Sequence, residues 1–512
     1  MMNFRVFGAA MTAALLVAAC GGGDDAAPPP PARGALLQTP APRTVSMTAA
    51  AFTAVLTANS PSLLQLAGTP VCGVDVQYIK YETVGGAGEA TDASGALMVP
   101  TGSSANCSGA RPIVLYAHGT NITKRYTLAD FTDSTNPAYS EAVMLAALYA
   151  AQGYVVVAPN YAGYDSSSLS YHPYLNADQQ SKDMIDALAA AKSALPTLTS
   201  PTTASTKLFV TGYSQGGHVA MATHRAMQAA GIPVTASAPL SGPYAFAAQS
   251  DANFYGMVSA GSTIFSPMIF TSFQKSYGNL YSTPSDVYEA AYASGIESLL
   301  PGTYDFTTVI TSVKLPMTAL FSSTPPAPAF ASITPPTGTG ATDALFAAGF
   351  GTGNLVKNSV RLAYLQDAMA HPDGVVPTFT NGAPATGATN PVRAAVIRND
   401  LRGWTPQAPV LLCGGNGDPT VFYSLNTGVM AALWSPQVAA NLVTVLDVDS
   451  AVSGPTDPFA AAKLGFAQSK AATINGAIAA GQDPAAAVVM SYHGGLVPPF
   501  CNAAARGFFS QF

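Results

Sequence analysis

Charged residues are scarce in this chain of 512 residues: 21 Lys and Arg and 27 Asp and Glu together make 9% of it. Their balance leaves a net charge of −6, which gives a nucleic acid no electrostatic attraction. After the N-terminus, no uninterrupted apolar run approaches the ~20 residues of a membrane-spanning helix. Disorder is also excluded, because 48% hydrophobic residues can offset the entropy lost on folding. The class of protein that is left is a large globular protein with a polar but weakly charged surface.

Cysteine is rare as well, with five in the chain. Cys20 ends the N-terminal segment and leaves four: Cys72, Cys107, Cys413 and Cys501. An even number in an exported chain favours two disulfides, although three pairings are possible and four buried free thiols are the alternative. We predict Cys72–Cys107, which closes a loop around an expected β-hairpin, and Cys413–Cys501.

The N-terminal segment is a targeting signal rather than part of the fold. A short basic start and an apolar stretch end at residues 17–20, Val-Ala-Ala-Cys, which resemble a bacterial lipobox. We predict a signal peptide over residues 1–19 and acylation of Cys20, which anchors the protein to the bacterial outer membrane. An ordinary secretory signal is the alternative. A Gly- and Pro-rich tether follows over residues 20–45.

Beyond the tether, short apolar strands alternate with helical stretches. The predicted strands cover residues 74–81, 96–99, 113–117, 154–158, 208–211, 234–238, 410–412 and 443–448. The predicted helices include residues 141–152, 178–195, 218–230 and 458–480. This alternation predicts an α/β fold with a mostly parallel sheet and helical crossovers.

The alternation stops between residues 245 and 405. Residues 252–273 carry no charged side chain and are rich in aromatic residues and methionine, and helical material follows near residues 284–300. We interpret residues 245–405 as a cap inserted into a core made of residues 46–244 and 406–512. The alternative is a separate packed domain with no role at the site.

Residues 212–216, Gly-Tyr-Ser-Gln-Gly, fit the pattern G-x-S-x-G with Ser214 at the centre. The pattern alone is weak evidence, and a Gly-rich turn is the ordinary interpretation. Here an apolar strand leads into it and a helix leaves it, which is the context of a nucleophile elbow. Ser214 is therefore the predicted nucleophile.

A serine hydroxyl needs a base to accept its proton, and His493 is the best placed of the six histidines. It lies late in the chain in the Gly-rich residues 491–495, which we expect to form a loop that carries the imidazole over the sheet. The others lie too early, in the cap, or on the helix behind Ser214: His118, His172, His218, His224 and His371.

The acid that orients the imidazole should follow the strand that resumes after the cap. Asp418 lies in the loop after that strand, where a carboxylate would fix the imidazole tautomer and stabilise the imidazolium. Asp447 and Asp449, at the end of the next strand, are alternatives. An Asx-type turn before Pro419 is a purely structural interpretation of Asp418.

The predicted disulfide Cys413–Cys501 fits this assignment. Cys413 lies five residues before Asp418, and Cys501 lies eight residues after His493. A bridge between them would join the two loops that must meet.

An oxyanion needs two preorganised N–H donors, each worth ~3–4 kcal/mol of the barrier. One should be the backbone amide of Gln215, directly after the nucleophile. The other should come from the loop after residues 113–117, most simply from Thr120, with Asn121 as the alternative.

Taken in order, these motifs resemble the α/β-hydrolase superfamily, and more narrowly the secretory lipase family of fungal lipase A and its bacterial lipoprotein relatives. The likeness covers roughly residues 70–505 and is carried by residues 118–120, 155–161, 212–217, 241–244, Asp418 and His493. The resemblance implies hydrolysis of carboxylic esters through an acyl-enzyme, without a metal or an organic cofactor.

We therefore predict a lipase or esterase that acts on apolar acyl or polyester substrates, because the cap is rich in aromatic residues and poor in charge. A serine peptidase or aminopeptidase on the same scaffold is one alternative. A non-catalytic outer-membrane binding lipoprotein is an alternative of another class. The predicted partners are an ester substrate and, through the lipid on Cys20, a membrane, but no nucleic acid.

Overall fold

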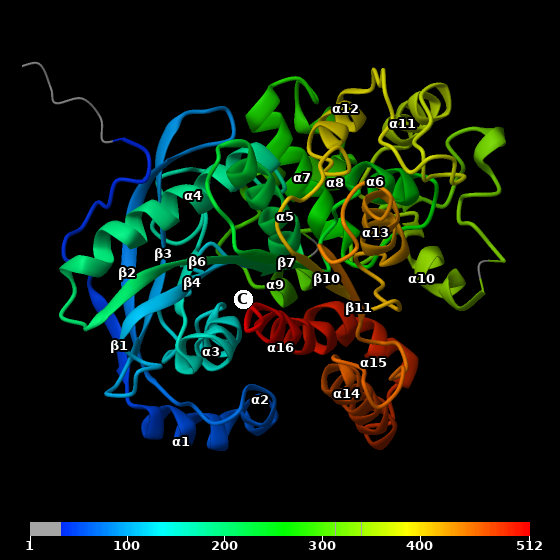
Figure 1. Ribbon diagram of the computed structural model, residues 1–512. Helices are drawn as coiled ribbons and strands as arrows, with labels where there is room; N and C mark the ends of the chain where they lie inside the picture. Colours follow the sequence, from blue (N-terminus) through cyan, green and yellow to red (C-terminus); the bar gives the residue numbers. More distant parts are fainter. Residues whose placement is uncertain (1–31, 313, 339) are drawn as a thin grey trace, which may run out of the picture. The chain divides into compact units, whose positions relative to one another are not determined.

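The structure is a computed structural model that describes residues 32–312, 314–338 and 340–512 (Figure 1). The predicted signal peptide and the acylation site Cys20 lie outside the described residues. Residues 33–512 form one unit. None of the helices in the described ranges is both long enough and apolar enough to span a bilayer.

A nine-stranded sheet has the order β1-β2-β3-β5-β4-β6-β7-β10-β11 (Figure 1). Strands β1, β2, β3 and β5 pair antiparallel, whereas β5, β4, β6, β7, β10 and β11 pair in parallel. The strands are β1 (Arg43–Met47), β2 (Gly73–Val84), β3 (Ala90–Thr101), β4 (Gly109–Ala117), β5 (Val155–Pro159), β6 (Thr202–Tyr213), β7 (Ala236–Leu240), β10 (Val410–Gly414) and β11 (Val443–Asp447). The predicted α/β fold with a mostly parallel sheet is therefore confirmed.

Helices flank the sheet on both faces, with α4 and α5 on one and α3 and α16 on the other (Figure 1). The helices outside residues 245–405 are α1 (Ala49–Asn59), α2 (Pro61–Ala67), α3 (Tyr139–Leu148), α4 (Ala177–Ala194), α5 (Gln215–Ala229), α13 (Val429–Trp434), α14 (Ala460–Ala479), α15 (Pro484–Ser491) and α16 (Val497–Phe509). Since both faces are covered, the central strands are apolar throughout and not alternating.

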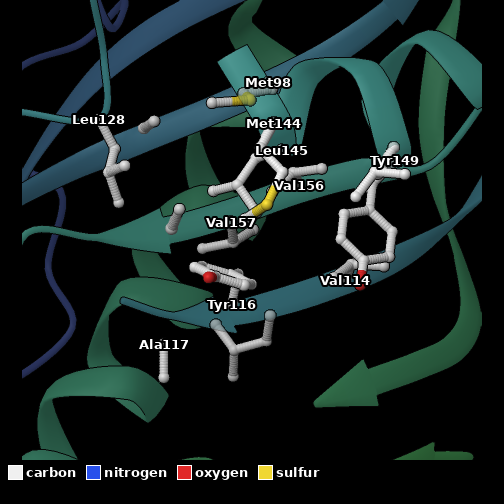
Figure 2. Packing of buried hydrophobic residues seen from close by; sticks show 14 of the residues in the cluster. Met98, Val114, Tyr116, Ala117, Leu128, Met144, Leu145, Tyr149, Val156 and Val157 are labelled. Atoms are coloured by element: carbon white, nitrogen blue, oxygen red, sulfur yellow. The ribbon is translucent and has the colours of Figure 1, made fainter. Parts of the chain in front are cut away.

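The core between the sheet and α3 illustrates this packing (Figure 2). Val114 of β4 and Val156 of β5 are fully buried, and Leu145 of α3 lies among the same cluster of side chains. Tyr116 and Tyr149 belong to the cluster as well and are also fully buried. A rigid, fully packed layer of this kind holds the ends of β4 and β6, where the candidate site lies.

Residues 245–405, here called the cap, run between β7 and β10. They hold α6 (Phe246–Phe254), α7 (Ser262–Tyr277), α8 (Ala290–Ala293), α9 (Phe306–Thr311), α10 (Asp343–Ala348), α11 (Asn358–Ala370), α12 (Pro391–Arg398) and a small parallel pair, β8 (Phe321–Ser322) with β9 (Phe350–Gly351). Most of the cap's buried apolar side chains form one cluster, which also includes Tyr174 and Leu175. The helical stretch expected near residues 284–300 is broken into three short segments, Pro284–Asp286, α8 and Ile296–Ser298, and Gly295, with a φ of +75°, separates the last two.

Part of the predicted tether is packed chain. Gly34 and Leu37 donate backbone hydrogen bonds to β2, and Arg33 forms an ion pair with Asp186 of α4. Residues 43–45 belong to β1. The expectation of a tether up to residue 45 was therefore wrong over residues 33–45, since few of their side chains are buried and the Pro-rich composition conceals the pairing.

Both predicted disulfides are confirmed. Cys72 bonds Cys107 and Cys413 bonds Cys501, with Cα–Cα distances of 5.4 and 5.7 Å. Two disulfides are consistent with an exported protein.

Candidate active site

Ser214 lies in the sharp turn between β6 and α5. Its backbone has φ 61° and ψ −121°, a strained conformation for a residue with a side chain. The turn fits only because glycines surround it: a Cβ on Gly216 would lie 2.0 Å from the carbonyl oxygen of Ala117. A Cβ on Gly217 would lie 2.4 Å from the carbonyl oxygen of Leu240. The elbow expected from G-x-S-x-G is therefore present.

Three side chains form a continuous hydrogen-bond chain at this turn. The Ser214 Oγ lies 2.7 Å from His493 Nε2, and His493 Nδ1 lies 2.6 Å from Asp418 Oδ2. Asp418 is 4% exposed, and the three residues are 279 and 75 positions apart in the chain. The structure brings together the three residues that the sequence analysis named.

His493 does not lie in a loop, as we expected, but in a π-helical turn, Tyr492–Leu496, between α15 and α16. Such turns often mark functional sites within helices. We predicted a loop because of Gly494 and Gly495, but both glycines lie within the π-helical turn. Helices α14 and α15 account for much of the long interval between Asp418 and His493 (Figure 1).

The carboxylate of Asp418 hydrogen-bonds both the backbone of its own turn and the imidazole of His493. Its Oδ1 accepts from the amides of Thr420 and Val421 at 2.9 and 3.0 Å, while Oδ2 faces His493. The Asx-type turn is therefore also present, and it orients the carboxylate toward the ring.

The two alternative acids contact other groups. Asp447 Oδ1 accepts from the amides of Asn416 and Asp449. Asp449 binds Lys470 Nζ and the Tyr492 hydroxyl. Neither carboxylate hydrogen-bonds His493.

The segments that carry Asp418 and His493 are joined in two further ways. The Cys413–Cys501 disulfide links the end of β10 to α16. Tyr492 accepts a hydrogen bond from the Gly417 amide at 2.9 Å. These links restrict the distance between acid and base.

Four of the other five histidines are buried and contact other groups. His172 donates from Nδ1 to the carbonyl of Ala162, and burial lowers its pKa to about 3. Burial lowers the pKa of His218 and of His224 to about 4, and lowers that of His118 as well. The lowered pKa values favour the neutral form of these four imidazoles, and none of the four hydrogen-bonds Ser214.

The candidate oxyanion donors lie on either side of Ser214. The Gln215 amide is the first N–H of α5, where no intrahelical acceptor exists. Its side chain is fixed by a 2.7 Å hydrogen bond from Nε2 to His172 Nε2. Thr120 follows Gly119, whose Cβ position is 3.9 Å from the Cβ of Ser214, and its hydroxyl bonds Tyr174 at 2.7 Å.

Glu141 is a contributor that sequence reasoning missed. Its Oε1 accepts from the Tyr116 hydroxyl and from the Gly119 amide at 2.7 and 3.3 Å, and its Oε2 accepts from Tyr126. The carboxylate therefore holds the loop that carries Thr120. The only sequence feature that could have indicated this role of Glu141 is that it is a carboxylate in a chain with few charged residues.

Two cavities meet at Ser214. A narrow one, about 80 Å³ in volume, extends under the cap and includes Gln215 and Ile269. A wide groove of about 980 Å³ includes Thr120 and His493. Within the described residues, no cluster of three or more His, Cys, Asp or Glu is suited to hold a metal ion.

Comparison with known proteins places this geometry in context. The prolyl oligopeptidase family (Peptidase S9) matches residues 140–234, less than a fifth of the chain. No curated protein matches the chain at a significant level.

Solved structures match over most of the chain. A ligand-bound form of the rice cell wall degrading esterase LipA from Xanthomonas oryzae is 25% identical with a TM-score of 0.66, covering 93% of this chain and 98% of that one. Another crystal structure of the same esterase is 27% identical with a TM-score of 0.63, covering 86% and 96%. Candida antarctica lipase A, at 12% identity and a TM-score of 0.42, covers 81% and 76% and is too distant to support an argument.

The sheet order, the family match and the likeness to the Xanthomonas esterase show that the chain is a hydrolase of the α/β-hydrolase superfamily. The resemblance to this superfamily that the motifs indicated is therefore confirmed.

Proposed function

We propose that this α/β-hydrolase is a serine esterase or lipase that cleaves carboxylic esters through an acyl-enzyme. The observation that supports this proposal most directly is the hydrogen-bond chain from Ser214 Oγ through His493 to Asp418. Hydroxyl, imidazole and carboxylate in this order are what a serine needs to become a nucleophile at neutral pH.

In the proposed reaction, Ser214 Oγ attacks the ester carbonyl while His493 Nε2 accepts its proton. Asp418 holds the ring through Nδ1 and stabilises the imidazolium. The amides of Gln215 and Thr120 receive the negative charge on the carbonyl oxygen. His493 then protonates the leaving alcohol, and water repeats the sequence to release the acid. No step requires a metal or an organic cofactor.

The proposed substrate is an ester with an apolar acyl group or an apolar polyester. No charged side chain lines the narrow cavity beside Ser214, and about half of its lining residues are apolar, including Phe246, Ile269 and Phe270. The similar Xanthomonas protein is described as a cell wall degrading esterase. Ester cleavage by the chain described here is consistent with that likeness.

A peptidase remains the second candidate, because part of the chain matches the prolyl oligopeptidase family. An aminopeptidase needs a free carboxylate to bind the substrate's amino terminus. Glu289, Glu297 and Asp305 line neither cavity. The one carboxylate in the groove is Glu141, which already accepts three hydrogen bonds. These features favour an ester substrate.

We also propose that Cys20 carries a lipid that anchors the enzyme to the outer membrane after export. The lipobox-like residues 17–20 support this, and the two disulfides fit an exported protein. Its partners are then an ester substrate and the membrane, without nucleic acid.

A fluorophosphonate probe tests the function. We expect it to label Ser214, located by mass spectrometry of the peptide, and to leave Ser214→Ala unlabelled. The same variant should lose p-nitrophenyl butyrate hydrolysis by about 10⁴-fold or more. Ser241→Ala is the matched control, since Ser241 also has positive φ at the end of a strand but no recorded contact with His493. An unlabelled wild-type protein would refute the proposal, and faster cleavage of aminoacyl-nitroanilides than of esters would support the peptidase.

A further inference from the structure

The two cavities at the candidate site are almost separate. Of the residues that line them, only Ser214 and Phe265 belong to both. Phe265 lies on α7 and is half-buried, and its ring packs over Gly261, where a Cβ would lie 2.7 Å from it. The phenyl ring therefore forms a wall between the cavities, with the nucleophile at its edge.

We infer that the narrow cavity binds the acyl half of the ester and the wide groove binds the alcohol half, with Phe265 dividing them. This inference rests on the proposed function. The alcohol oxygen must receive its proton from His493 Nε2, and His493 lines only the groove. The acyl substituent lies across the carbonyl carbon from that oxygen, on the side of Gln215, which lines only the narrow cavity.

The sizes of the cavities then set the specificity. The narrow cavity is about 80 Å³ against about 980 Å³ for the groove, so it suits a short or medium acyl chain. The groove of about 980 Å³ lies at the upper end of the range for small-molecule sites, so it accepts a much larger group.

The groove's lining indicates the chemistry of the alcohol. Its polar side chains are mostly uncharged, among them Asn59, Ser62 and Ser469, and aromatic side chains such as Tyr139 and Phe500 also line it. Its single carboxylate, Glu141, is already hydrogen-bonded, and no Lys or Arg lines it. A charged head group would find no counter-ion there, so the geometry favours a bulky neutral alcohol.

The acyl half is tested with p-nitrophenyl acetate, butyrate, hexanoate, octanoate and laurate. For the wild type we expect the highest kcat/KM at butyrate or hexanoate and a fall of about tenfold or more at laurate. Ile269→Trp, which fills the narrow cavity, should shift the optimum to acetate. Phe265→Ala, which removes the wall, should raise the laurate-to-acetate ratio. Ile269→Phe replaces Ile269→Trp if the latter does not fold.

The alcohol half is tested with phenyl, 2-naphthyl and 4-biphenylyl acetate, whose leaving groups are phenols of similar acidity. We expect the wild type to accept all three with kcat/KM values within about threefold. Leu63→Trp, in the groove, should lower the biphenylyl-to-phenyl ratio by about tenfold and leave the acyl-length profile in place. Ile478→Trp, on the exposed side of α14 and 61% exposed, is the control for both tryptophan variants.

The outcomes separate the two proposals. If Ile269→Trp alters only the alcohol series and Leu63→Trp only the acyl series, the assignment is reversed and the inference is wrong. If both variants behave like Ile478→Trp, neither cavity holds substrate and the inference is also wrong. Every variant is first labelled with the fluorophosphonate probe. Failure of the wild type to label refutes the esterase itself rather than the division of its substrate.

Discussion

Asp418 divides its two carboxylate oxygens between two partners. Oδ1 accepts from two backbone amides and Oδ2 faces His493 Nδ1. An asparagine could keep the Oδ1 contacts, but its amide nitrogen would then face the ring. Nδ1 would have to become the acceptor, so Nε2 would carry the proton and could not take one from Ser214.

We therefore expect Asp418→Asn to fold normally and to lose about 10⁴-fold in kcat. Thermal unfolding and p-nitrophenyl butyrate kinetics measure the two properties. Asp447→Asn is the matched control, because Asp447 also accepts from two amides but does not contact the imidazole. Equal losses in both variants would contradict the role given to Asp418.

Ser214 and Asp418 could be predicted because each is tied to a local pattern, and His493 could be predicted from its late position in the chain. Ser214 stands in G-x-S-x-G, and Asp418 follows a strand at the same sheet edge. Glu141 and His172 could not be predicted, since their roles depend on contacts with Gly119 and Gln215 that only the folded chain creates.

At the scale of elements, the elbow depends on close packing of β4 against α5. Gly216→Ala would place a Cβ 2.0 Å from a carbonyl oxygen of β4, so the strand and the helix must separate. We expect the free energy of unfolding to fall by about 3 kcal/mol and the activity to be lost, as measured by urea denaturation and ester kinetics.

Gly476→Ala on α14 makes the same change where nothing lies within 4 Å. It should stabilise the helix by up to about 1 kcal/mol and leave activity intact. A Gly216→Ala enzyme with wild-type stability would mean that the elbow tolerates a side chain.

Elements were predictable where apolar runs were continuous and less so elsewhere. Strand β6 begins at Thr202, whereas the apolar run predicted a start at residue 208, because its first half is largely exposed and polar. Strand β1 was missed because only Val45 of its five residues is buried. We expected a loop around His493 because two consecutive glycines are typical of loops. The segment instead continues the helices on either side of it as a π-helical turn.

At the scale of the whole molecule, the two disulfides close loops of different function. Their sequence separations are 35 and 88, so each should stabilise the fold by about 4–5 kcal/mol through the unfolded state. Only Cys413–Cys501 joins the segments that carry acid and base.

We expect Cys413→Ser with Cys501→Ser to lower both the Tm and kcat/KM, measured on p-nitrophenyl butyrate. Cys72→Ser with Cys107→Ser should lower the Tm by a similar amount and leave kcat/KM close to that of the wild type. If the two pairs of substitutions changed kcat/KM equally, the bridge near the site would have no positioning role.

Phe265 and the small size of the narrow cavity beside Ser214 have a consequence for the cleavage of polyesters. A polyester chain whose acid side continued over many repeat units would have to pass through the narrow cavity of about 80 Å³. Under the proposed division of the substrate, long polyester strands would be trimmed one terminal unit at a time and would not be cut at random interior bonds. Short acids would accumulate from the start of digestion, while the average length of the remaining strands would fall only gradually.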